Sequence, residues 1–222
     1  MDNIKSNSYF AKRILKSVET LTRYIEDKSI DDLLNDGFLC DAIENRFTKI
    51  AEDASNLTND FKKSTPEIPW NAIVTIRNKV CHNYDVVDAP TLYRTIKFDF
   101  STFRNNLLKT MTVHYMNLQP NPFERIKKKT KNVEMRLFDE KRQTLETGNL
   151  IVFTNLATKQ EIIVEVVDLK RFASFEQLYA HYKKTELGYN NDEIANPSDM
   201  LAYYSKDKID KYGVLAIEIK LL

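Results

Sequence analysis

Apolar positions in the first half of the chain recur with the 3.6-residue period of an amphipathic helix. One stripe occupies residues 9–25, and a second helical face begins after Ser29 and continues to Ala54. This half contains a single glycine, Gly37. The pattern is typical of an all-α helical bundle.

Two further helices are expected in the same half. Pro69 suits the first turn of a helix, because a first-turn residue has no intrahelical partner for its N–H. That helix is predicted from about Trp70 to Asn83, and another, with a kink, from about Ala89 to Met116.

The pattern changes at residues 119–122, which read Gln-Pro-Asn-Pro. Prolines are excluded from helix interiors, so we place the domain boundary here, with domains at residues 1–117 and 118–222. Beyond the boundary, runs rich in β-branched residues and bounded by turns predict strands at 133–138, 149–154, 162–169 and 214–219. Helical stretches at about 174–184 and 197–208 make the second domain α+β.

Composition narrows the class of protein. The 222 residues carry a net charge of +1, so any nucleic-acid-binding face depends on local clustering of charge. Two cysteines and three scattered histidines offer no structural zinc site, so we predict no metal and no cofactor, or at most carboxylates with a loosely held Mg²⁺. No run approaches the roughly 18 apolar residues that span a bilayer. With no signal-peptide core, the expected location is cytoplasmic and away from membranes.

The most informative stretch is the predicted helix that ends near Tyr84. Asn78 and His82 are four residues apart and share one helix face, and Arg77 lies on an adjacent face, off the apolar stripe. Histidine exchanges protons near neutral pH, and arginine stabilises the negative charge that develops on phosphorus during RNA cleavage. The alternative is that Arg77 and His82 are solvated cations near a helix end.

The stretch resembles the HEPN signature Arg-x-x-x-x-His, in the HepT-like form that continues x-Tyr; here these residues are Arg77, His82 and Tyr84. The resemblance covers about residues 5–112. It implies an up-and-down bundle that forms a homodimer, and metal-independent ribonuclease activity that often serves as a toxin. We expect Arg77 and His82 to carry catalysis and Asn78 to support them. The resemblance also implies a nucleotidyltransferase antitoxin that adenylylates Tyr84. One departure is that 51–53 read Ala-Glu-Asp where the family has Gly-Glu-Ala.

The second half opens with a basic run. Residues 121–142 contain eight basic and four acidic side chains, a local net charge of +4. Such a strip can bind RNA phosphates, and the alternative is a solvated face. The candidate RNA-binding residues are Lys127, Lys128, Lys129, Lys131, Glu134 and Arg136.

This half resembles the ASCH family, over about residues 121–222. The family motif Gly-x-Lys-x-x-Glu-x-Arg aligns with 129–136, where Lys129 takes the Gly position. The resemblance implies a PUA-like β-barrel that binds RNA or a modified nucleoside. Some members deacylate a modified cytidine with a lysine that matches Lys131 and a threonine nucleophile, whose position is Glu134 here.

Alternation along a strand puts Glu134 and Arg136 on one face, either contacting RNA or forming an internal ion pair. Tyr203 and Tyr204 are candidates to stack bases, and at least one is expected in the core. The combined prediction is a homodimeric RNA endonuclease with an RNA-binding domain. The rivals are a non-catalytic RNA-binding dimer and a modified-nucleoside hydrolase.

Overall fold

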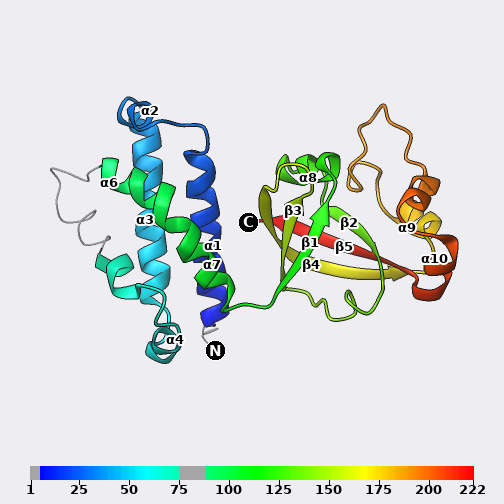
Figure 1. Cartoon of the computed structure of the whole chain (residues 1–222), viewed down its shortest axis with the longest axis horizontal. Helices are drawn as coiled ribbons and strands as arrows, with labels where there is room; N and C mark the ends of the chain where they lie inside the picture. Colours follow the sequence, from blue (N-terminus) through cyan, green and yellow to red (C-terminus); the bar gives the residue numbers. More distant parts are fainter. Residues whose placement is uncertain (1–5, 76–88) are drawn as a thin grey trace. The chain divides into compact units, whose positions relative to one another are not determined.

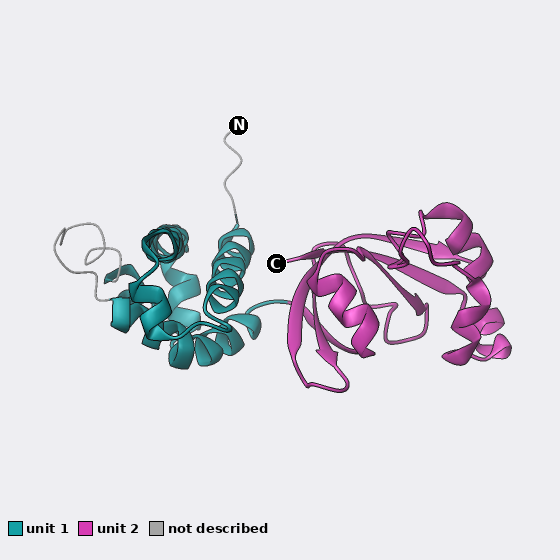
Figure 2. Ribbon diagram, turned by 90° about the horizontal axis from the view of Figure 1, so that it is seen from above, with its two compact units in different colours: residues 1–111 teal, residues 112–222 magenta. Residues whose placement is uncertain are grey.

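The structure is a computed structural model that describes residues 6–75 and 89–222. The chain forms two compact units, Met1–Met111 and Thr112–Leu222, coloured teal and magenta in Figure 2. The first unit is helical and the second is built around a sheet, as the sequence predicted.

The helical unit consists of short and medium helices, and side chains cap the starts of the first four. The side chains of Ser6, Ser29, Asp36 and Thr58 each accept a hydrogen bond from a backbone N–H of the helix that follows. Ser29 and Asp32 form a complete capping box. The helices, labelled in Figure 1, are α1 (Asn7–Tyr24), α2 (Ile30–Leu34), α3 (Gly37–Ser55), α4 (Asn59–Ser64), α6 (Ala89–Arg94) and α7 (Phe100–Leu108).

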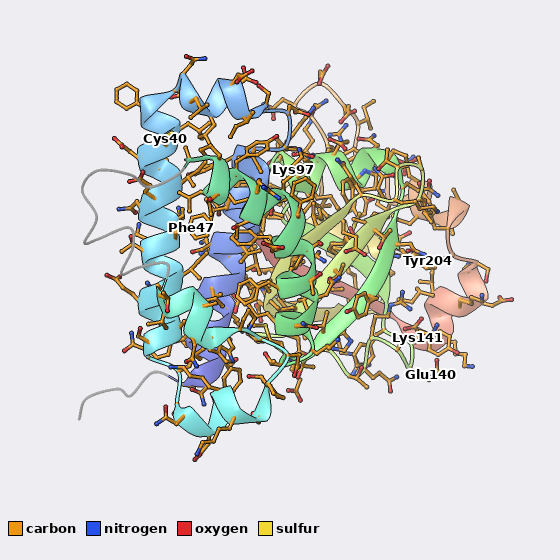
Figure 3. All side chains as sticks on the ribbon, turned by 60° about the vertical axis from the view of Figure 1, so that its left-hand side comes forward. Cys40, Phe47, Lys97, Glu140, Lys141 and Tyr204 are labelled. Carbon is orange, nitrogen blue, oxygen red and sulfur yellow. The ribbon has the colours of Figure 1, made fainter. Side chains whose placement is uncertain are left out.

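The core of this unit lies between α1, α3 and α7. Ile14 and Leu21 of α1 are fully buried, as the apolar stripe predicted. Phe47 of α3, labelled in Figure 3, packs against Phe100 of α7 with ring centroids 5.5 Å apart. Burial of such side chains stabilises the unit by about 1.5–3 kcal/mol each.

The helix expected from Ala89 to Met116 is correct in its first part and wrong in its last. A π-helical turn, η1 (Thr95–Asp99), separates α6 from α7 in the segment where a kink was expected, and such turns are a common cause of helix kinks. The helix ends at Leu108, and strand β1 (Val113–Leu118) follows. Met116 and Leu118 are buried while Tyr115 and Asn117 are exposed, so the true period is two.

The sheet unit holds five strands in the order β1-β3-β4-β5-β2. β1 runs parallel to β3, and every other neighbouring pair is antiparallel. The remaining elements are β2 (Val133–Leu137), β3 (Leu150–Asn155), β4 (Glu161–Phe172), β5 (Val214–Leu221), α8 (Pro120–Lys127), α9 (Phe175–His181), η2 (Pro197–Ala202) and α10 (Lys206–Tyr212). The four predicted strands are confirmed, and β1 is the strand that the sequence reading missed.

The two prolines that we used to place a boundary open α8, with Pro at its first turn. The sequence boundary fell after residue 117, whereas the compact units meet between Met111 and Thr112. The difference is β1, which pairs with β3 and so forms part of the sheet.

The faces of the sheet carry separate apolar cores. Phe123, Phe153 and Ile217 belong to one, and Val133, Leu178 and Val214 to the other. Glu134 and Arg136 of β2 pair in register with Ile217 and Leu215 of β5. Directly opposite residues share a sheet face, so both charges point to the side of the first core.

Candidate functional site

The candidate catalytic residues of the helical unit, Arg77, Asn78, His82 and Tyr84, lie outside the described residues. The approach to them is described. Residues 70–75 are helical, as predicted. Trp70 is buried and its indole N–H donates to Thr65 Oγ1 at 2.9 Å, which anchors the start of this helix.

The segment aligned with the family's Gly-Glu-Ala has a structural role at Asp53. Glu52 is exposed, whereas Asp53 is buried and accepts a hydrogen bond from Arg13 Nε at 2.9 Å. Asp53 therefore joins α3 to α1.

A cavity of about 440 Å³ opens in the sheet unit. Its walls come from the end of β1, the start of α8, strand β2, residues 187–193 and residues 200–204. β1 and β2 are the two edges of the sheet, so the cavity lies at the seam that strand pairing leaves open. Arg136 of β2 spans this seam, because its Nη2 donates to the carbonyl of Asn117 in β1 at 2.8 Å.

Lys131 lies inside the fold, with only 5% of its surface exposed. Its ammonium donates to the carbonyls of Val133 at 2.7 Å and Leu187 at 2.9 Å, and lies 3.5 Å from Glu134 Oε2. Burial lowers the pKa of Lys131 below its usual value, and Glu134 opposes that shift. Lys131 is therefore not part of an exposed phosphate-binding strip, which corrects the sequence reading.

Gly188 makes the burial of Lys131 possible. A Cβ at this position would lie 3.0 Å from Lys131 Cδ, and the backbone φ of +99° is rare for L side chains. Only glycine meets both conditions without strain.

Glu134 lies between the two cations. Its Oε1 is 2.9 Å from Arg136 Nε, and its side chain is 7% exposed. The prediction that Glu134 and Arg136 share a strand face is confirmed. The pair is internal, yet both residues also line the cavity, so the two alternatives left open by the sequence are compatible.

Arg125 of α8 was not singled out from the sequence. Its guanidinium donates to both carboxylate oxygens of Glu193, at 2.8 and 3.0 Å, and to the Gly188 carbonyl. It also donates to Asn121 Oδ1 at 2.7 Å and to Asn190 Oδ1 at 3.3 Å. Arg125 thereby ties residues 188–193 to the cavity wall. Except for Asn121, its partners lie more than sixty residues away in the sequence, and no local pattern indicated them.

Lys129, at the family's Gly position, has a φ of +60°. Its N–H donates to Ile126 O and the Thr130 N–H donates to Arg125 O, both at 2.9 Å. These two bonds form a Schellman motif that ends α8 after the C-cap residue Lys128. The motif favours glycine at this position, which explains the family pattern.

The basic run divides by exposure. Lys128 and Lys129 are exposed and Lys127 is half-buried, so these three remain candidates for phosphate contacts. Tyr203 is 61% exposed at the cavity. Tyr204, labelled in Figure 3, is partly buried and stacks on Phe175 at 5.9 Å, so one tyrosine of the pair is in the core as expected.

Among the described residues, those that line the cavity include no Ser, Thr, Cys or His. Across the described ranges 6–75 and 89–222, no group of three His, Cys, Asp or Glu side chains forms a metal site. Within those same ranges, no helix is long and apolar enough to cross a membrane.

Two family models match the chain, one for each half. Residues 14–110 match the family "Ribonuclease HepT-like", and residues 116–222 match the ASCH domain. The first match spans the positions of Arg77 and His82, and the second spans the whole cavity.

Individual relatives cover about half of this chain. A Methanocaldococcus jannaschii protein named as a gamma-glutamylcyclotransferase and candidate RNase is 30% identical over 107 residues, which are 48% of this chain and 48% of that protein. A Thermococcus cleftensis protein named as a probable ribonuclease HepT is 29% identical over 47% of this chain and 96% of its own length. The solved structure of PF0455 from Pyrococcus furiosus is 30% identical in sequence and has a TM-score of 0.38. The match covers 50% of this chain and 97% of the PF0455 chain.

Proposed function

We propose that this chain, which joins a HepT-like domain to an ASCH domain, is a metal-independent RNA endonuclease whose ASCH domain holds the RNA. The observation that carries the proposal is the match of residues 14–110 to a ribonuclease family, because this segment contains the Arg77-x-x-x-x-His82 pair.

In the proposed reaction the RNA supplies its own nucleophile. The 2′-oxygen loses a proton and attacks the adjacent phosphorus, and the bond from phosphorus to the 5′-oxygen breaks. The products are a 2′,3′-cyclic phosphate and a 5′-hydroxyl. His82 exchanges the protons, Arg77 stabilises the charge on the phosphorane, and Asn78 supports them.

The reaction needs both a general base and a general acid, and the Arg77/His82 pair of one protomer supplies only one histidine. We therefore propose a homodimer through the helical unit, which brings two Arg77/His82 pairs into one cleft. Light scattering at micromolar concentration should give twice the mass of 26.0 kDa. A monomer under conditions in which the protein cleaves RNA would contradict the composite site.

The proposed biological setting is a cytoplasmic toxin–antitoxin pair. Tyr84 is the acceptor for an adenylyl group from a nucleotidyltransferase partner. Mass spectrometry after co-expression with such a partner should find one added AMP, which Tyr84→Phe should abolish.

The two rivals make different predictions. A non-catalytic RNA-binding dimer would bind RNA without cleaving it. A modified-nucleoside hydrolase working through the ASCH cavity needs a nucleophile. Glu134 stands where that chemistry uses a threonine, and among the described lining residues the only hydroxyl groups are those of tyrosines. The lining therefore favours binding over hydrolysis in this cavity.

The experiment that tests the proposal is cleavage of a mixed RNA pool by the pure full chain in excess chelator. We expect cleavage with 2′,3′-cyclic phosphate ends, and its loss in Arg77→Ala and His82→Ala. The absence of cleavage by the wild-type chain in any buffer would leave the binding dimer as the better description.

A further inference from the structure

Of the three described cations that line the cavity, Lys131 and Arg125 are fully engaged by protein acceptors. Lys131 has three N–H donors, and they meet the Val133 and Leu187 carbonyls and Glu134. Arg125 directs its guanidinium to Glu193, Gly188, Asn121 and Asn190. Neither side chain has a donor left for a ligand phosphate.

Glu134, in contrast, still offers acceptor positions. Each carboxylate oxygen has two lone pairs, and the structure gives each oxygen one cationic partner, Arg136 for Oε1 and Lys131 for Oε2. One acceptor position therefore remains on each oxygen, in a side chain that lines the cavity.

Arg136 complements this acceptor. Its Nη2 donates to the Asn117 carbonyl, and its guanidinium also makes a side-chain hydrogen bond with Tyr204. Its buried Nε lies 2.9 Å from Glu134 Oε1 as an ion pair but makes no hydrogen bond, so fewer than five of its N–H groups have partners. Donors are therefore left over beside the carboxylate. A ligand that fits presents two adjacent donors to Glu134 and one acceptor to Arg136.

The walls add a preference for a planar group. Leu156, Leu187 and Met200 line the cavity with Tyr203, whose ring is 61% exposed. Base stacking on such a tyrosine is worth about ten-fold or more in affinity. Apolar side chains thus form part of the wall, and Glu134 and Arg136 offer acceptor and donor positions beside them.

We propose that the cavity binds one unstacked guanine base of the RNA, with Glu134 accepting from its N1–H and 2-amino groups and Arg136 donating to its O6. The inference rests on the proposed role of the sheet unit in holding RNA. Among the four bases, guanine alone presents two adjacent donors on its Watson–Crick edge. The phosphates stay outside, where Lys128 and Lys129 are exposed.

The first test needs no variant at Glu134, whose loss would leave buried cations unpaired. Calorimetric titration of the full chain with nucleoside 5′-monophosphates should rank GMP tightest. IMP, which lacks the 2-amino group, should bind about ten-fold weaker or worse, as should AMP, CMP and UMP. Inorganic phosphate at millimolar concentration should not displace GMP. Equal binding of IMP and GMP, displacement by phosphate, or no binding of GMP would overturn the proposal.

A matched pair of variants places the site. Tyr203→Ala should weaken GMP about ten-fold. Tyr115→Ala, at a tyrosine that is 68% exposed in the same unit but does not line the cavity, should leave GMP binding unchanged. An equal effect of the two variants would contradict the assignment.

The outcome is separable from that of the nuclease proposal. In an Arg77→Ala, His82→Ala double variant, GMP binding should persist at the wild-type level while cleavage is lost. If the wild-type chain cleaves RNA but does not prefer GMP, only the guanine-site proposal is contradicted. If it prefers GMP but does not cleave RNA, only the nuclease proposal is contradicted. Loss of GMP binding in the double variant would place the nucleotide in the helical unit and overturn the guanine pocket.

Discussion

The two units use charged residues in different surroundings. In the helical unit, Arg13 of α1 is 46% exposed at its side chain and reaches the buried Asp53 of α3. In the sheet unit, the three charges of Lys131, Glu134 and Arg136 lie together, with side chains 4%, 7% and 15% exposed. The first arrangement joins helices at the edge of an apolar core, and the second lies inside the fold at the seam between two edge strands.

A run of basic residues in a sequence does not by itself indicate an exposed, ligand-binding surface. Neighbouring lysines in residues 127–131 differ in exposure, because Lys128 and Lys129 are exposed whereas Lys131 is buried. Buried charges are tolerated only when they are paired and hydrogen-bonded. The cluster of Lys131, Glu134 and Arg136 therefore has a structural role in the sheet unit whether or not a ligand is bound.

Replacing Lys131 with Met should have the largest effect. The change removes one partner of a buried charge cluster and leaves the Val133 and Leu187 carbonyls without their donor, which should lower the free energy of unfolding by about 3–5 kcal/mol. The control is Lys141→Met at an exposed lysine labelled in Figure 3, which should stay within about 0.5 kcal/mol. Chemical denaturation measures both. Equal effects would show that the cluster does not stabilise the unit.

Arg77→Ala should lower the rate of RNA cleavage by about 10²–10³-fold, because removing one donor to the transition-state charge typically has that effect. Arg77→Lys should recover only part of the rate, since a point charge does not replace the planar fork of guanidinium. Single-turnover kinetics at saturating RNA separate this loss from weaker binding. Full activity in Arg77→Lys would argue against bidentate contact with the phosphorane.

Replacing Lys127, Lys128 and Lys129 together with Ala should weaken RNA binding and flatten its salt dependence. Each lost phosphate contact reduces the slope of log affinity against log salt by about 0.7 for single strands, so the slope should fall by about 2. The control removes the same charge from α10, at Lys206, Lys208 and Lys211. An unchanged slope in the first variant, or an equal fall in both, would mean that the lysines are merely solvated.

The smallest effect is expected at Lys129. Glycine is free of the steric penalty at φ +60°, so Lys129→Gly should raise the free energy of unfolding by about 0.5–1 kcal/mol. The matched control is Lys128→Gly, where φ is −82° and glycine should destabilise by a similar amount. Destabilisation by both substitutions would contradict the Schellman assignment.

Local pattern predicted much of this structure. The apolar stripe of α1 follows from the helical period, and β2 to β5 follow from runs of β-branched residues bounded by turns. The shared face of Glu134 and Arg136 follows from strand alternation. The missed strand, β1, is short, and only Met116 and Leu118 within it are buried, so its alternation was too brief to outweigh the helical pattern before it.

The burial of Lys131 was beyond local pattern for a different reason. It depends on Gly188, whose missing side chain leaves room for the lysine stem, and on the carbonyl of Leu187. Leu187 lies 56 positions away from Lys131 in the sequence. The same holds for the clamp of Arg125 on Glu193, which only the folded chain brings together. The catalytic candidates Arg77 and His82 follow from their spacing and from the family resemblance.

The most direct measurement is therefore the cleavage rate of a defined RNA by wild type and His82→Ala, side by side in excess chelator. Loss of general acid–base catalysis should lower the rate by about 10²–10⁴-fold, with the melting temperature of the variant unchanged. Wild-type products should carry 2′,3′-cyclic phosphate ends. An equally active His82→Ala chain, or wild-type cleavage that stops in chelator, would contradict the metal-independent ribonuclease.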